Sequence, residues 1–104
     1  MKTRNRQSGY SINIANQYID NKSPIQSLST ELEAQLKFED NQPTGEVIAY
    51  KGWFSQAGLP PFQVKFNSKV NLPSYSSLVE FEHLEACEVG FNVYFRATDL
   101  KEVK

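Results

Sequence analysis

The fold is decided by residues 31–39, which read Glu31-Leu32-Glu33-Ala34-Gln35-Leu36-Lys37-Phe38-Glu39. Every even position in this stretch is apolar and every odd position is polar, which is the period of a strand that buries one face. A helix is the competing interpretation, because the sequence also places Ile25, Leu28, Leu32 and Leu36 at helical spacing after Ser23-Pro24. The strictness of the alternation favours the strand.

Further segments of strand character follow this stretch. The expected strands are 31–39, 46–55, 62–66, 78–87 and 92–97, and the tail from Thr98 finishes the last of them with Leu100 or Val103 docked. Turn formers separate them at 40–45, 56–61 and 88–91. Gly52 marks a bulge or a close backbone approach in the second strand. The pattern predicts an all-β fold, a small five-stranded OB-like barrel, with a small β-sandwich as the alternative.

The first 30 residues differ in composition from the rest of the chain: they are polar and rich in Asn, Gln and Ser. We interpret residues 1–30 as a partly flexible N-terminal arm and residues 31–104 as the barrel domain. Helical spacing of Ile12, Ala15 and Ile19 predicts one short helix near residues 11–20. At 104 residues the chain has room for one hydrophobic core.

Composition narrows the class of protein. No apolar run approaches the ~20 residues that a membrane-crossing helix needs, and no signal-peptide pattern follows the basic N-terminal residues, so a cytoplasmic protein is expected. Cys87 is the only cysteine, which excludes an internal disulfide and fits a reducing compartment. Because the net charge is −1, any affinity for nucleic acid must come from a local patch.

The sequence offers little for catalysis or metal binding. His83 is the only histidine, and a structural zinc site needs four ligands. Neither it nor Cys87 has a local partner of the kind that activates a nucleophile. The acidic run through Glu80, Glu82, Glu85 and Glu88 is interpreted as a solvated face, and the scattered glycines form no phosphate-binding loop. We therefore expect no enzyme, no metal and no cofactor.

Aromatic residues on the expected strands are the remaining indication of function in the sequence. Five phenylalanines fall on the apolar parity and are expected in the core: Phe38, Phe62, Phe66, Phe81 and Phe95. Four other rings are harder to bury together, and with nearby cations they form the predicted nucleic-acid-binding residues: Tyr50, Lys51, Trp53, Phe54, Lys65, Lys69, Tyr94 and Arg96. Exposed rings stack on the bases of single strands while cations meet phosphates. Core filling is the open alternative for each ring. Lys2, Arg4 and Arg6 of the arm could contact phosphates as well.

The C-terminal half carries a resemblance. Leu78-Val79-Glu80-Phe81-Glu82-His83-Leu84-Glu85-Ala86 and Asn92-Val93-Tyr94-Phe95-Arg96-Ala97-Thr98-Asp99-Leu100 resemble the end of a family of small proteins carried by conjugative transposons and plasmids of Gram-positive bacteria. The match covers about a third of the chain. It implies an accessory factor that helps a helicase unwind the element's DNA. The layout also resembles the single-stranded DNA-binding proteins of filamentous phages, with their OB-like barrel and surface tyrosines.

Together these observations predict a cytoplasmic single-stranded DNA-binding or helicase-assisting protein of a mobile element, acting in replication or conjugative transfer. The expected partners are single-stranded DNA and a helicase or other conjugation protein, without a membrane. A homodimer is an open alternative for the oligomeric state. The rival function is a protein-protein interaction module that docks another protein through a sheet edge or an aromatic patch and binds no nucleic acid.

Overall fold

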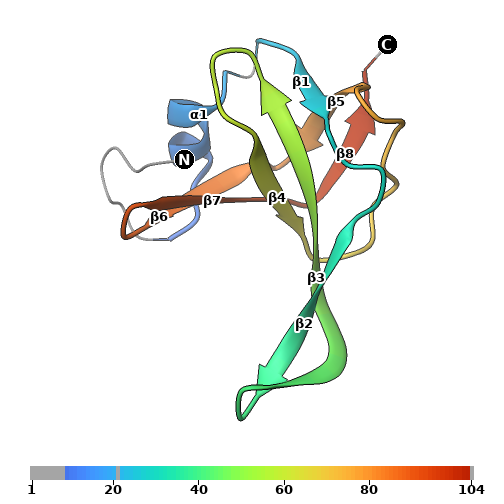
Figure 1. Ribbon diagram of the computed structural model, residues 1–104. Coiled ribbons are helices and arrows are strands. Elements are labelled where there is room, and N and C mark those ends of the chain that lie inside the picture. Colours follow the sequence, from blue (N-terminus) through green and yellow to red (C-terminus); the bar gives the residue numbers. More distant parts are fainter. Residues whose placement is uncertain (1–8, 21, 104) are drawn as a thin grey trace.

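The computed structural model describes residues 9–20 and 22–103, and strands dominate this part of the chain (Figure 1). One short helix, α1 (Ile12–Tyr18), precedes eight strands within the described residues. The strands are β1 (Ile25–Ser27), β2 (Glu33–Glu39), β3 (Gln42–Gln56), β4 (Phe62–Phe66), β5 (Leu78–Glu82), β6 (Glu85–Val89), β7 (Asn92–Ala97) and β8 (Asp99–Glu102). The mainly β class and the short helix near residues 11–20 are confirmed, and the stretch 31–39 contains strand β2 (Glu33–Glu39) rather than a helix.

All eight strands belong to one mixed sheet in the order β6-β7-β4-β3-β1-β5-β8, with β2 paired to β3 beside β1. Only β4 and β7 run parallel; the other pairs in the described residues are antiparallel. No ladder in the described residues joins β6 to β8, so the sheet is open. The expected small barrel is therefore not closed, and a single sheet is not the two-sheet sandwich either.

The strand number exceeds the expected five because the chain bends within segments that read as continuous. Residues 78–87 were expected as one strand, but His83 adopts a left-handed backbone with φ of 53° and separates β5 from β6. Such a backbone is uncommon for a residue with a Cβ and cannot continue a ladder. A bend at Thr98 separates β7 from β8. Strand β1 is a further addition, from the expected arm.

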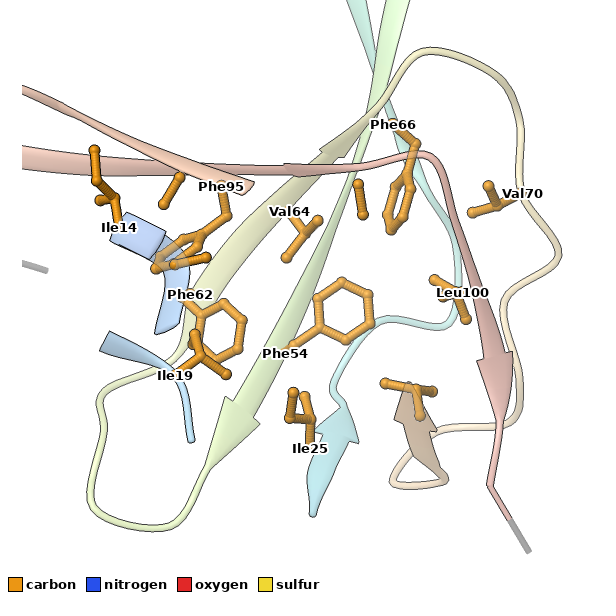
Figure 2. Close-up of a cluster of buried hydrophobic side chains, with 14 residues drawn as sticks. Ile14, Ile19, Ile25, Phe54, Phe62, Val64, Phe66, Val70, Phe95 and Leu100 are labelled. Carbon is orange, nitrogen blue, oxygen red and sulfur yellow. The ribbon is translucent and has the colours of Figure 1, made fainter. Parts of the chain in front are cut away.

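The hydrophobic core lies on one side of the sheet, under α1. Phe54 sits at its centre among Phe62, Val64, Phe66 and Leu100, as Figure 2 shows. Four residues of the expected arm belong to the same core: Ile14, Ala15, Ile19 and Ile25. The arm is therefore packed against the rest of the chain where the structure describes it. Leu100 is buried, as expected of the tail.

Two hairpins extend away from this core. Strand β2 and the first half of β3 project downward in Figure 1, and β6 with β7 extends to the left. Phe38 lies near the tip of the β2–β3 hairpin and is 63% exposed, so its assignment to the core is wrong. Its parity is correct, but no part of the described chain covers that end of the hairpin. No helix among the described residues has the length and apolar character that a membrane crossing requires.

Candidate nucleic-acid interface

The outer face of the sheet carries a row of charged residues that the strand register lines up side by side. Each member is the direct partner of the next across the ladder. From β2 to β6 the row runs Glu33, Lys51, Lys65, Arg96, Glu85. Three cations therefore occupy neighbouring strands at the middle, over a width of about 10 Å. Like charges directly opposite each other destabilise a sheet, so this row costs stability and favours an anion above it.

Two exposed rings lie beside the cation row. Trp53 follows Lys51 by two residues on β3, and Tyr94 precedes Arg96 by two residues on β7. Because β3 and β7 run in opposite directions, both rings fall on the same side of the row, about 7 Å along the strands. Their exposed fractions are 44% for Trp53 and 48% for Tyr94. The face thus offers a line of cations parallel to a line of rings.

The backbone of Trp53 is fixed by the segment between β1 and β2. The Trp53 amide donates to Oγ of Ser29 at 2.7 Å, and its carbonyl accepts from the amide of Leu28 at 2.9 Å. On the opposite face of the same strand, the flanking Phe54 is completely buried. Trp53 therefore projects from a strand that is held on its core side and along its edge.

The three cations differ in their partners. The Nε of Arg96 donates to Oε1 of Glu85 at 2.9 Å, and its guanidinium lies 4.0 Å from the ring centre of Tyr10. Lys65 has its ammonium 5.8 Å from the same ring. Neither Lys51 nor Lys65 forms an ion pair with any residue that the structure describes. Two ammonium groups without an ion pair among the described residues thus stand next to a guanidinium that a carboxylate and a ring hold in place, and Glu33 lies directly across the ladder from Lys51.

A groove of about 470 Å³ runs over this face. Its wall includes Tyr10, Lys51, Trp53, Lys65 and Tyr94. Gln35 of β2 also lines it, and the buried Oε1 of that side chain has no hydrogen-bond partner among the described residues. A buried acceptor without a partner costs stability.

Five of the eight residues predicted from the sequence share this outer face. They are Lys51, Trp53, Lys65, Tyr94 and Arg96. Phe54 is wrong as a stacking residue, because it is 0% exposed at the centre of the core. Tyr50 has the same parity as Phe54 and pairs with the buried Phe66, so it lies on the opposite side of the sheet. Lys69 lies in the segment after β4, outside the groove wall.

The sequence reasoning missed Tyr10 and Gln35. Tyr10 belongs to the expected arm, and the bridge between Ser11 and Ala86 brings it beside β6. No periodicity in the sequence indicates that contact. Gln35 could have been found, because it has the strand parity of Glu33. The proposed phosphate contacts of Lys2, Arg4 and Arg6 lie outside the described residues.

The partly buried position of Tyr10 leads to a prediction at alkaline pH. Burial and a hydrogen bond with Cys87 raise the pKa of Tyr10 from 10.0 to about 12, against a smaller opposing effect of Arg96. Since the raised pKa favours the neutral phenol in the folded state, its contribution to stability is complete below pH 10 and is lost between pH 10 and about 12.

We expect the free energy of unfolding of the wild type to fall more steeply over this window than that of Tyr10→Phe. Urea unfolding at several pH values measures the difference, and spectrophotometric titration follows the phenolate directly. Equal slopes for the two proteins would show that the Tyr10 hydroxyl is solvated rather than buried.

A second groove, of about 560 Å³, lies between α1 and the strands β1 and β5. Its wall is mainly apolar, and its charged residues are of both signs, including Lys22 and Glu80. It lacks the concentration of cations and rings that marks the first groove. Among the described residues, no group of three or more His, Cys, Asp or Glu side chains could hold a metal ion.

The acidic run of β5 and β6 is only partly the solvated face that was expected. Glu80 and Glu82 are exposed, and Glu80 pairs with Lys101 at 3.7 Å. Glu88, however, is buried, and its Oε2 accepts a hydrogen bond of 2.6 Å from the hydroxyl of Tyr18 in α1. That carboxylate therefore joins the helix to the sheet.

Comparison with protein-family models, with curated proteins and with solved structures finds no match to this chain. The resemblance to proteins of conjugative elements and to phage proteins therefore stays a prediction from the sequence.

Proposed function

We propose that this protein binds single-stranded DNA on the outer face of β3, β4 and β7. The observation that carries the proposal is the row of three neighbouring cations, Lys51, Lys65 and Arg96, beside two exposed rings. A strand lying across the sheet would run its phosphates along the cations and lay its bases on Trp53 and Tyr94. Each stacked base contributes about 1 to 3 kcal/mol without sequence-specific hydrogen bonds. This recognition suits an accessory factor that assists a helicase in replication or conjugative transfer.

The strand order supports an OB-like architecture as part of the proposal. We take β1 with β2 as one interrupted strand, β5 with β6 as another and β7 with β8 as a third, so that β3 is strand two, β4 is strand three, β5–β6 is strand four and β7–β8 is strand five. The pairing then runs first to second, second to third, third to fifth, fifth to fourth and fourth to first, with third and fifth parallel. This is the order of an OB-type barrel, here opened where the chain bends at Thr98. Such barrels bind oligonucleotides on the face of strands two and three, which correspond to β3 and β4.

The two projecting hairpins fit the same interpretation. In OB-type proteins the loops between strands one and two and between strands four and five flank the ligand. The corresponding connections here are the β2–β3 and β6–β7 hairpins (Figure 1). A single strand of DNA on β3 and β4 would therefore pass between the parts of these hairpins that adjoin the sheet, while the end of the β2–β3 hairpin, directed away from β4 and β7, stays clear of it.

Fluorescence of Trp53, the only tryptophan, tests the proposal directly. Titration with an oligothymidine of about 12 nucleotides, within the range of roughly 4 to 16 that one such domain covers, is expected to quench it by stacking. With three phosphate contacts, the logarithm of the binding constant should fall with the logarithm of salt concentration at a slope of about −2.

Trp53→Phe, followed by fluorescence anisotropy of a labelled oligonucleotide, should retain binding with reduced affinity, since a smaller ring remains. Absence of any quenching and of any anisotropy change at low salt would exclude DNA binding. The rival function as a protein-interaction module would then be favoured.

A further inference from the structure

The exposed end of the β2–β3 hairpin, residues 36–48, has the surface of an unoccupied interface. Phe38, Val47 and Ile48 are all largely exposed there. A two-stranded ribbon with nothing packed on it is marginally stable on its own, and exposed apolar residues within one short segment mark a site of association. We call residues 36–48 the hairpin end.

The charge of the hairpin end is opposite to that of the groove. It carries Glu39, Asp40 and Glu46 against the single cation Lys37, which gives a net charge of −2. Lys37 is already paired with two of the carboxylates, at 3.4 Å to Glu39 and 3.9 Å to Glu46. The groove presents Lys51 and Lys65 without ion-pair partners among the described residues. The acidic and apolar residues of the hairpin end are thus complementary to the cations and rings of the groove.

The hairpin end cannot reach the groove of its own molecule. β3 is one strand from Gln42 to Gln56 and carries both the hairpin end and Lys51. Along an extended strand Glu46 stands about 17 Å from Lys51, and Figure 1 shows the hairpin directed away from β4 and β7. Packing of two hairpin ends on each other would bring together two surfaces of the same negative charge. The groove of a second copy is the complementary surface.

We propose, on the basis of the function proposed above, that the hairpin end of one molecule occupies the groove of a second molecule, so that self-association and single-stranded DNA compete for the same cations and rings. Each molecule has one hairpin end and one groove, so a reciprocal exchange satisfies both in a closed two-fold pair. Free protein is then held with its groove covered, and DNA releases the monomer.

Analytical ultracentrifugation of the full-length protein tests the pairing. We expect a dimer at about 50 mM salt that dissociates on raising the salt, because screening weakens the attraction between opposite charges. Addition of saturating oligothymidine should also yield monomers carrying DNA. A protein that is monomeric at every salt concentration while still binding oligothymidine would overturn the pairing and leave the proposed function intact.

Substitutions in the hairpin end separate dimerisation from the binding of oligothymidine. Phe38→Ala is expected to weaken dimerisation by about tenfold or more, as loss of an interface anchor does, and Glu39→Gln/Glu46→Gln should weaken it and reduce its salt dependence. Neither change should lower the intrinsic affinity for oligothymidine. The matched controls are Tyr75→Ala, also an exposed ring, and Glu82→Gln/Glu102→Gln, also two exposed carboxylates.

The inference fails if the controls weaken the dimer as much as the hairpin variants do. It also fails if saturating oligothymidine binds the dimer without dissociating it. Loss of dimerisation in the hairpin variants, in a protein that binds no oligothymidine, would support the pairing and reject only the DNA-binding proposal on which its competition rests.

Discussion

The double variant Lys51→Gln/Lys65→Gln is expected to bind oligothymidine roughly 60-fold more weakly than the wild type at about 50 mM salt. Each phosphate contact on a single strand contributes about 0.7 to the salt slope, which corresponds to a factor of about eight at that concentration. Both lysines lie in the cation row without ion-pair partners among the described residues. The salt slope should become shallower in parallel, from about −2 to about −0.7.

The free energy of unfolding of the double variant shows whether the loss of binding arises without a loss of stability. Because the two ammonium groups are direct cross-strand partners, their removal relieves a like-charge contact, and the free energy of unfolding should stay equal or rise by a few tenths of a kcal/mol. Lys69→Gln is the matched control, since Lys69 is an exposed lysine outside the groove wall. If Lys69→Gln weakened binding as much as either groove substitution, the DNA would follow a different path over the surface.

Strand parity separates the correct site residues from the incorrect ones. Successive side chains on a strand point to opposite faces, so Lys51 and Trp53 must lie on one face and Tyr50 and Phe54 on the other. The eight predicted residues could therefore never have formed one surface. The apolar parity of Phe62, Val64 and Phe66 identifies the core side of the neighbouring strand, and the observed pairing of Phe54 with Phe62 places Phe54 on that side, so parity identifies Phe54 as core once the β3–β4 register is known.

The row of cations could not be predicted in the same way. Its existence depends on register, because Lys51 meets Lys65 and Lys65 meets Arg96 only at the observed alignment of three strands. Register follows from loop lengths and bulges, and β4 pairs with β7 in parallel across 25 intervening residues, counted from Phe66 to Asn92. No local pattern in the sequence encodes that alignment.

Phe38 shows a third limit of what an alternating sequence pattern can predict. Alternation correctly predicts that Leu36 and Phe38 share a face, but a periodic pattern does not indicate how far the body of the protein extends beneath it. Leu36 is half-buried, whereas Phe38 lies beyond the core. The same apolar parity therefore produces core at one end of the hairpin and exposed surface at the other.

Phe54→Ala is expected to lower the free energy of unfolding by about 3 to 5 kcal/mol, a large fraction of the 5 to 15 kcal/mol typical of a domain. The ring is completely buried, with centroid distances of 4.8 Å to Phe81, 6.4 Å to Phe62 and 6.4 Å to Phe66. Truncation removes the apolar transfer energy and leaves a cavity among rings that can relax only in part. Urea unfolding followed by Trp53 fluorescence measures the loss.

Gly52 makes the position of that ring testable independently of the size of the loss. A Cβ at Gly52 would lie 3.1 Å and 3.2 Å from two atoms of the Phe54 ring, so the close contact at this glycine is with a side chain and not with another backbone as expected. Gly52→Ala should therefore cost about 1 kcal/mol or more in the wild type through overpacking. In the Phe54→Ala background the added methyl meets space instead of a ring, so the two changes should be strongly non-additive. Additive losses would mean that the ring does not pack over Gly52, and the sheet face opposite the groove would then lack the rigid support on which the placement of Trp53 depends.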